Sequence, residues 1–197
     1  MSETQAIDWE GRYRAGIAGW WERHGLHPAF LAWRASGELA PCRILVPGCG
    51  RSLEPLAFAE AGFDVTAMDA APSAVAMQRA YFARLKVPGH IERDDLFAWD
   101  PDSPFDAIYD QNCLCALPPA LWPAYSRRLH RWLRPQGRLF ILLMQTGAPD
   151  GPPFHSDLQA MRRIFAPPAW TWPEALPEQV PHPSGRGAEQ PAVLRRN

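Results

Sequence analysis

The stretch LVPGCGRSLEPLAFAEAGFDVTAMDAAP, residues 45–72, decides the fold class. A short apolar run enters a turn that contains Gly48 and Gly50, a helical pattern follows, and a second apolar run ends at Asp69. This order of strand, glycine turn, helix and strand is typical of a parallel sheet covered by helices. In such a sheet the glycine turn lies at the carboxyl ends of the strands, where ligands bind. The stretch therefore predicts both a fold class and a ligand site.

The rest of the chain continues the alternation of strands and helices. We expect the helix that follows the glycine turn to begin with Ser52 as its N-cap and to stop at Gly62. After Thr146 prolines become frequent, and the pattern predicts one more helix over 152–165, loop over most of 173–190 and a terminal edge strand at 192–196. The patterns predict strands at 43–46, 63–69, 105–110 and 137–145, a short strand within 89–97, and helices over 52–62, 72–85 and 119–133.

These elements predict a doubly wound, mostly parallel, seven-stranded sheet of the Rossmann type, with helices on both faces. We expect one domain over residues 1–197, because this length suits a single large core. Residues 1–40, which we call the lead-in, are dense in aromatics, and we expect them to form a helical N-terminal lid. Residues 41–197 are expected to form the core.

Composition excludes several classes of function. The net charge of -1 provides no basic surface for nucleic acid or for a membrane. No apolar run reaches the roughly 18 residues of a membrane span, and the first residues lack the apolar segment of a signal peptide. The cysteines at 42, 49, 113 and 115 form no C-x-x-C pair, so we expect free thiols and no metal site. We expect a cytoplasmic monomer that acts on a small molecule.

The glycine turn differs from the dinucleotide-binding pattern in one position. Gly48 and Gly50 let the backbone approach a ligand closely, but Leu53 occupies the position of the third glycine in G-x-G-x-x-G. Asp69 ends the second strand, where a carboxylate can accept both hydroxyls of a ribose. This combination favours a nucleoside cofactor without a pyrophosphate, and S-adenosylmethionine is the candidate.

Further candidate residues lie on both sides of this segment. Asp94 and Asp95 follow the third strand, where they can hold the amino group of an adenine. Trp9, Tyr13 and Trp20 share a face if they lie on one helix. Aromatic rings attract a sulfonium cation, so these three rings can cover the donor as a lid.

Four stretches resemble the thiopurine S-methyltransferase family, which includes plant-type halide and thiol methyltransferases. They are the W-x3-Y-x6-W pattern that starts at Trp9, the segment ILVPGCGRSLEPLAFAEAGFDVTAMDAAPSAV at 44–75, FDAIYDQNCLCALPP at 105–119 and DGPPF at 150–154. The resemblance implies that a methyl group passes from S-adenosylmethionine to a soft nucleophile. For the donor it implies rings of Trp9, Tyr13 and Trp20 above it, Gly48 at the methionine part, Asp69 at the ribose, Asp94, Asp95 and Leu96 at the adenine, and Asp110 near the methionine amino group or the reacting centre. Gly50, in the same turn as Gly48, is a further cofactor-binding candidate.

The sequence departs from the thiopurine-type pattern at positions that bear on the acceptor. Gln111 stands where such members often carry an arginine, and it cannot supply that charge to a thiolate. Tyr13 stands where a tryptophan is expected. Asp110 and Tyr13 are the candidate catalytic residues, and Gln111, Phe154 and His155 are the candidate acceptor residues. The acceptor itself stays open among thiols, thiopurines, halides, sulfide and oxidised selenium or tellurium species.

Two alternatives stay open at this point. A nicotinamide-dependent oxidoreductase can use a similar sheet, although Leu53 in place of the third glycine counts against it. A non-catalytic module that binds S-adenosylmethionine is the other alternative, because Gln111 and the proline-rich tail are compatible with an acceptor pocket that has been lost.

Overall fold

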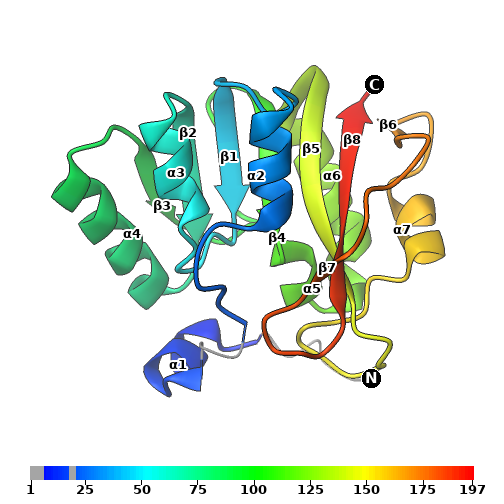
Figure 1. Cartoon of the computed structure of the whole chain (residues 1–197), viewed down its shortest axis with the longest axis horizontal. Coiled ribbons are helices and arrows are strands. Elements are labelled where there is room, and N and C mark those ends of the chain that lie inside the picture. The colour runs from blue at the N-terminus through cyan, green and yellow to red at the C-terminus, as the bar shows by residue number, and fades with distance from the viewer. Residues whose placement is uncertain (1–6, 18–20) are drawn as a thin grey trace.

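The computed structural model describes residues 7–17 and 21–197. Its centre is an eight-stranded sheet with the order β3-β2-β1-β4-β5-β8-β6, in which β7 also pairs with β8 (Figure 1). Strands β1 to β5 run parallel and β8 is antiparallel to β5, so the predicted doubly wound, mostly parallel sheet is confirmed. The strands are β1 (Arg43–Pro47), β2 (Asp64–Asp69), β3 (His90–Arg93), β4 (Phe105–Gln111), β5 (Leu133–Gln145), β6 (Trp170–Thr171), β7 (Val180–Pro181) and β8 (Ala188–Arg196).

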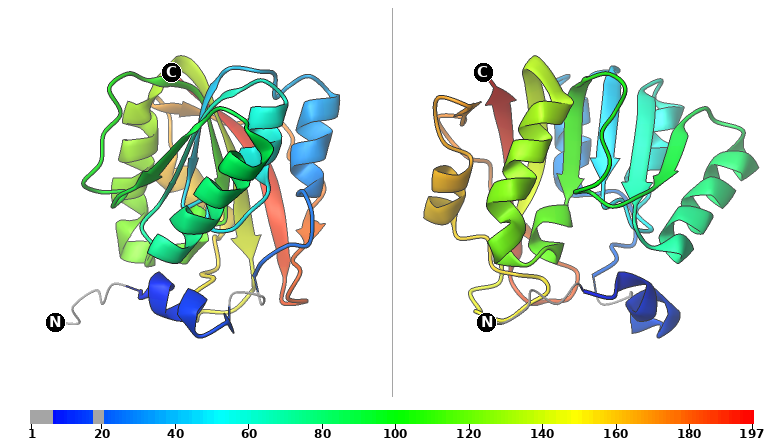
Figure 2. Two further views of the ribbon diagram at one scale, coloured as in Figure 1. Left: turned by 90° about the vertical axis from the view of Figure 1, so that its left-hand side faces the viewer. Right: turned by 180° about the vertical axis from the view of Figure 1, so that it is seen from behind.

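Helices cover both faces of this sheet (Figures 1 and 2). The helices α2, α3 and α4 lie on one face, α5, α6 and α7 lie on the other, and α1 lies beyond the carboxyl ends of β1 and β4. Within the described residues, no helix has the length and apolar character needed to cross a membrane. The helices are α1 (Trp9–Arg14), α2 (Pro28–Ala35), α3 (Glu54–Glu60), α4 (Pro72–Leu85), α5 (Cys113–Ala116), α6 (Trp122–Trp132) and α7 (Leu158–Ile164), with a 3-10 turn η2 (Pro119–Leu121) before α6.

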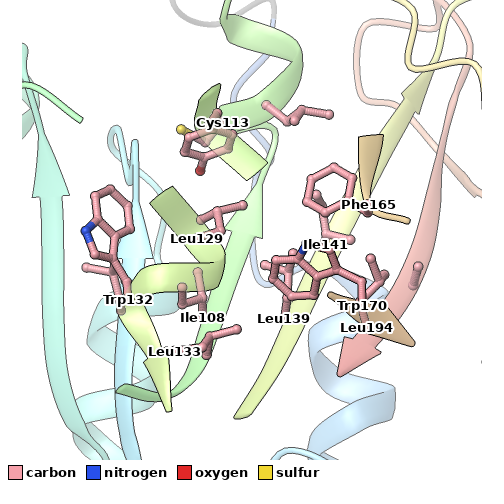
Figure 3. Packing of buried hydrophobic residues seen from close by; sticks show 14 of the residues in the cluster. Ile108, Cys113, Leu129, Trp132, Leu133, Leu139, Ile141, Phe165, Trp170 and Leu194 are labelled. Carbon is pink, nitrogen blue, oxygen red and sulfur yellow. The ribbon is translucent and has the colours of Figure 1, made fainter. Parts of the chain in front are cut away.

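The sheet separates two hydrophobic layers because successive side chains of a strand point to opposite faces. In β5, Leu139, Ile141 and Leu143 pack with α6 and α7, whereas Phe140 and Leu142 pack with α2 and α3. Figure 3 shows the first layer, with Leu139 and Ile141 beside Trp170. All five of these β5 side chains are fully buried, so β5 is the strand on which both layers depend.

The expected lid over residues 1–40 divides into two parts. Phe30 and Trp33 of α2 make edge-to-face contacts with Tyr109, at centroid distances of 6.0 and 6.2 Å. The ring of Trp33 also contacts the ring of Phe140, with 5.2 Å between the ring centroids. The second half of the lead-in is therefore part of the core, and only the region around α1 lies over the strand ends.

Two predicted details of individual elements are wrong. Helix α3 begins at Glu54 after Leu53, and not with Ser52 as its N-cap, because residues 48–53 are used to form the turn. The backbone carbonyl of Ser52 instead accepts a hydrogen bond from Gln78 Nε2 at 2.8 Å. The terminal strand β8 is not an edge strand, since it lies between β5 and β6 and pairs with β5 over eight positions.

Substitution of one β5 side chain tests the dependence of the fold on this strand. We expect Leu139→Ala to lower the free energy of unfolding by about 2–5 kcal/mol, because a fully buried leucine leaves a cavity. Leu31→Ala is the matched control, since Leu31 is 50% exposed, and it is expected to change stability by under about 1 kcal/mol. Chemical denaturation of both variants measures the difference, and equal losses would contradict this description of the core.

Candidate active site

A cavity of about 390 Å³ is lined by residues at the carboxyl ends of the parallel strands and by residues of α1. This volume lies within the range of pockets that bind small molecules and cofactors. Trp20, one of the predicted residues, falls outside the described residues. The lining includes eight of the predicted site residues, namely Trp9, Tyr13, Gly48, Gly50, Asp69, Asp95, Leu96 and Gln111.

The turn after β1 forms a backbone cradle in the cavity. Gly48 and Gly50 have φ angles of +54° and +53°, in the left-handed region that favours glycine. A Cβ atom on Gly48 would lie 2.6 Å from Cys113 Sγ, and one on Gly50 would lie 2.7 Å from Tyr13 Oη. Both positions therefore require glycine for two reasons: the backbone has a positive φ, and a neighbouring side chain leaves no space for a Cβ atom.

Asp69 is fixed beside this cradle. Its Oδ2 accepts a hydrogen bond from Gly50 N–H and its Oδ1 accepts one from Ala71 N–H, each at 2.8 Å. Burial raises the pKa of Asp69, and the backbone hydrogen bonds act in the opposite direction. The carboxylate lines the cavity with unused lone pairs, so it is available to the hydroxyl groups of a ligand.

Three rings make an aromatic cover over the cavity, and one of them was not predicted. Trp21 makes edge-to-face contacts with Trp9 and Tyr13, at centroid distances of 5.6 and 6.2 Å. Glu10 ties α1 to α4, because its carboxylate accepts hydrogen bonds from Ser73 N–H at 2.9 Å and from Ser73 Oγ–H at 2.7 Å. The cover is thus anchored to the core on the side of the glycine turn.

The segment after β3 contributes part of what the sequence predicted. Asp95 and Leu96 line the cavity together with Phe97, and Asp95 Oδ1 accepts a hydrogen bond from Phe97 N–H at 2.7 Å. Asp94 is exposed and does not line the cavity. Its Oδ1 accepts a hydrogen bond from the Asp95 N–H at 2.7 Å, so it shapes the turn.

Asp110 lies under the cavity floor and does not line it, in contrast to its expected contact with the donor. Its Oδ1 accepts hydrogen bonds from the N–H groups of Cys113 and Leu114, at 2.9 and 3.3 Å, and its Oδ2 accepts one from Tyr125 Oη–H at 2.9 Å. Burial raises its pKa to about 6, against the effect of these hydrogen bonds. In this position Asp110 fixes the start of α5.

The predicted acceptor residues are only partly brought together. Gln111 lines the cavity, and its Oε1 accepts a hydrogen bond from Tyr109 Oη–H at 2.8 Å. Phe154 packs against the core, and the Nδ1 atom of His155 accepts a hydrogen bond from Gly147 N–H at 3.2 Å, so neither side chain lines the cavity. Pro152 and Pro153 of the same segment do line it.

The sequence analysis did not predict a buried polar network around Glu189 of β8, at the end of the cavity away from the glycine turn. The carboxylate of Glu189 accepts hydrogen bonds from Arg23 Nη2 at 2.6 Å, from Asn112 Nδ2 at 2.6 Å and from His27 Nε2 at 3.0 Å. The N–H of Ala29 donates to His27 Nδ1, so the ring proton of neutral His27 lies on Nε2. Arg23 and Asn112 line the cavity. Arg23 and His27 are four positions apart, but Asn112 and Glu189 lie far from them and from each other in the chain, so no local motif predicts these contacts.

Comparison with known proteins decides the family. The family model of thiopurine S-methyltransferase matches residues 4–192. The chain belongs to the thiopurine S-methyltransferase family. The predicted enzyme class is thereby confirmed as a methyltransferase that uses S-adenosylmethionine and acts on small molecules, and the oxidoreductase and non-catalytic alternatives are not favoured.

The relatives of this chain are named for different acceptors. A probable thiol methyltransferase 2 of Arabidopsis thaliana is 29% identical over 85% of this chain and 75% of its own length. Thiocyanate methyltransferase 1 of the same plant is 27% identical over 92% of this chain and 81% of its own length. A thiopurine S-methyltransferase of Stutzerimonas stutzeri is 31% identical over 60% of this chain and 57% of its own length.

Solved structures support the fold. A 1,6-didemethyltoxoflavin-N1-methyltransferase of Burkholderia thailandensis, with bound S-adenosylhomocysteine, superposes with a TM-score of 0.76 at 21% identity, and the match covers 100% of this chain and 93% of that one. The magnesium protoporphyrin IX methyltransferase of Synechocystis PCC 6803 gives a TM-score of 0.72 at 15% identity, over 95% and 97% of the two chains. The fold of this family member is thus that of S-adenosylmethionine-dependent methyltransferases.

A double-mutant cycle tests the contact between the glycine cradle and the aromatic cover. We expect Gly50→Ala to weaken binding of S-adenosylhomocysteine at least tenfold, because the new Cβ meets Tyr13 Oη and the φ of +53° is strained. In a Tyr13→Phe background the loss should be smaller, since the hydroxyl is gone, but strain of about 1–2 kcal/mol remains. Calorimetric dissociation constants of the four proteins measure the coupling, and strictly additive losses would exclude the contact.

The raised pKa of Asp110 predicts a pH-dependent stability. Because the native pKa of about 6 exceeds the ordinary value of 3.8, the native state binds more protons than the unfolded state between these values. The free energy of unfolding should therefore fall by about 2 kcal/mol as the pH rises from 4 to 6. We expect Asp110→Asn to remove this fall, whereas Asp102→Asn, at an exposed position, retains it. Urea denaturation across this pH range gives the comparison, and parallel curves for all three proteins would contradict it.

Proposed function

We propose that this enzyme transfers the methyl group of S-adenosylmethionine to the sulfur atom, or to a comparably soft atom, of a small acceptor bound in the cavity. The observation that supports this most directly is the position of the Asp69 carboxylate. It stands beside the Gly48 and Gly50 cradle and below the rings of Trp9 and Tyr13, in one cavity. This set of groups suits a nucleoside that carries a sulfonium cation.

The residues of the cavity fit the parts of this donor. The lone pairs of Asp69 would accept the two ribose hydroxyl groups, and Asp95 would border the adenine. The cradle leaves no room for a Cβ at Gly48 or Gly50, so backbone groups would face the methionine part. The rings of Trp9 and Tyr13 would attract the sulfonium, an interaction worth on the order of 0.5–2 kcal/mol. When bound, the donor supplies an electrophilic methyl group and leaves as a neutral thioether.

The chain then contributes orientation and exclusion of water. Holding two reactants in line can supply up to about 7–11 kcal/mol of the barrier reduction. Tyr13 contributes its ring and not a base, because burial, followed by the charge of Asp69, holds the pKa of its hydroxyl far above neutrality. The leaving group needs no acid, so a catalytic acid is not part of this proposal.

We also infer that the enzyme acts as a cytoplasmic monomer. The four cysteines at 42, 49, 113 and 115 are free thiols, and the last three are buried. Free thiols are typical of a reducing compartment.

Calorimetry with the product S-adenosylhomocysteine tests the donor site. We expect the wild-type enzyme to bind this ligand and Asp69→Ala to weaken binding by tenfold or more, because the ribose hydroxyls lose their charged partner. NAD⁺ and NADH serve as control ligands and should not bind. An acceptor screen with thiols, sulfide, thiocyanate and iodide, followed by detection of the methylated product, completes the test. Donor binding without turnover of any soft nucleophile would overturn the proposal.

A further inference from the structure

The cavity continues beyond the part that we assign to the donor. Its donor residues follow β1, β2 and β3, whereas β4, β5 and the β7–β8 region supply the opposite end. β4 is the direct neighbour of β1, but β8 lies three strand spacings of about 4.8 Å from β1, so the end beside β7 and β8 is distinct from the donor end. The far end is lined by Asn112, Cys115, Pro153 and His182, together with Arg23 of the lead-in. An acceptor would therefore lie among these residues.

Arg23 is held at this end with part of its guanidinium free. Its Nη2 donates to Glu189 Oε2 at 2.6 Å and to the backbone carbonyl of Pro181 at 2.9 Å. Its Nη1 and Nε atoms have no hydrogen-bond partner within residues 7–17 and 21–197. Glu189 is only 1% exposed, and Asn112 and His27 occupy its other acceptor positions. The ion pair thus orients the arginine, and its remaining N–H donors are available to a ligand.

His182 lies next to this arginine, since it directly follows Pro181. It is 4% exposed, and its Nδ1 accepts a hydrogen bond from Ser184 N–H at 3.3 Å and lies 2.7 Å from Ser184 Oγ. The neutral ring therefore carries its proton on Nε2, which has no partner among the side chains that the structure describes. Burial lowers the pKa of His182; among the charges that face it, Glu189 of β8 raises this pKa, and Arg23 and His27 lower it.

We propose that Arg23 and His182 form an anion site for the acceptor, and that the nucleophile enters as a soft anion: a thiolate, bisulfide, a pseudohalide or a halide. This inference rests on the proposed function and specifies the acceptor's charge. The free N–H groups of the guanidinium, which the carboxylate of Glu189 orients, are charge-assisted donors that Gln111 cannot supply, and Nε2–H of His182 is a second donor. A charge-assisted hydrogen bond of this kind is stronger than a neutral one.

The other two cavity arginines are engaged on the donor side. The guanidinium of Arg51 lies 4.5 Å from the ring centroid of Tyr13 and its Nε lies 4.0 Å from Glu22 Oε1. The guanidinium of Arg12 lies 5.4 Å from the ring centroid of Trp9. Of the three arginines that line the cavity, Arg23 is therefore the one beside β7 and β8.

With an anionic acceptor, the charges and electron pairs of the transfer step balance without a catalytic base. A lone pair of the acceptor forms the new bond to the methyl carbon while the bond between that carbon and the donor sulfur breaks. The released electron pair stays on the donor sulfur, which changes from a sulfonium to a neutral thioether, and the acceptor changes from an anion to a neutral methyl product. A thiol loses its proton to solvent before this step, so no proton moves during the transfer.

Iodide locates the site without any requirement for turnover. Crystals of the wild-type enzyme with S-adenosylhomocysteine, soaked in iodide, should show anomalous scattering between Arg23 and His182. Iodide at Arg12 or Arg51 instead, or no iodide in the cavity, would overturn the proposal. If the enzyme binds S-adenosylhomocysteine but methylates no soft nucleophile, the proposed function fails, while the iodide position still decides whether the anion site exists.

Kinetics with matched variants give the second readout. We expect His182→Phe and Arg23→Gln to raise the KM for thiocyanate at least tenfold while the dissociation constant of S-adenosylhomocysteine changes less than twofold. Arg23→Lys should restore part of the loss. His182→Phe keeps the test sharp if Arg23→Gln destabilises the chain, because His182 makes no hydrogen bond to Glu189. Arg127→Gln removes a positive charge at an exposed position outside the cavity and should leave the KM for thiocyanate within twofold. An equal increase in this control would contradict the assignment.

The pH dependence separates anionic from neutral acceptors. Between pH 6 and 9 the rate with thiocyanate should stay flat, because it is an anion throughout. The rate with a simple thiol should rise about tenfold per pH unit below that thiol's own pKa. A thiol rate that does not change below that pKa would show that the neutral form is methylated and would refute the proposal.

Discussion

Glu189 carries a carboxylate that is almost fully buried, and a charge in that position is stable only when it is paired. Its partners come from the lead-in, from the N-terminus of α2 and from the end of β4, through Arg23, His27 and Asn112. One charge on β8 therefore holds together three segments that surround the cavity. Burial raises the pKa of Glu189, but the hydrogen bonds from His27 and Asn112 and the charge of Arg23 outweigh it, so the pKa is lowered and the carboxylate is ionised.

Asp110 is a second buried carboxyl group, but its pKa shifts in the opposite direction from that of Glu189. It is also fully buried, but its partners are two backbone N–H groups and one phenol, and none of them is charged. Burial therefore prevails and its pKa rises. The two acids therefore have different structural roles. Glu189 orients polar and charged groups around the cavity, whereas Asp110 fixes the start of the short helix α5.

The local part of this structure could be predicted from the sequence. The segment from β1 to β2 carries its fold in its own apolar periods, and Gly48, Gly50 and Asp69 follow from it because their roles depend on nearby backbone. Prediction failed where long-range pairing decides. Strand β8 is interior only because β6 and β7, each two residues long, pair with its other side.

The same contrast between local and long-range contacts decides which site residues could be predicted from the sequence. Asp110 has the sequence position of a ligand, but Tyr125, fifteen residues further along the chain, occupies its Oδ2. Arg23 lies 166 positions from Glu189, and a separation of that size leaves no periodic signal. The sequence pattern and the resemblance to a family predicted residues around the donor, whereas the polar end of the cavity required the three-dimensional structure.

The wide separation of Arg23 and Glu189 also has a consequence for biosynthesis. A ribosome adds about 5–20 residues per second, so Arg23 and His27 emerge roughly 10–30 s before the acid that neutralises them. During that interval the first five strands can assemble, while the wall of the cavity beside β4 lacks its counter-charge. The buried charge network of the cavity can therefore form only after β8 is made, because its carboxylate lies on that strand.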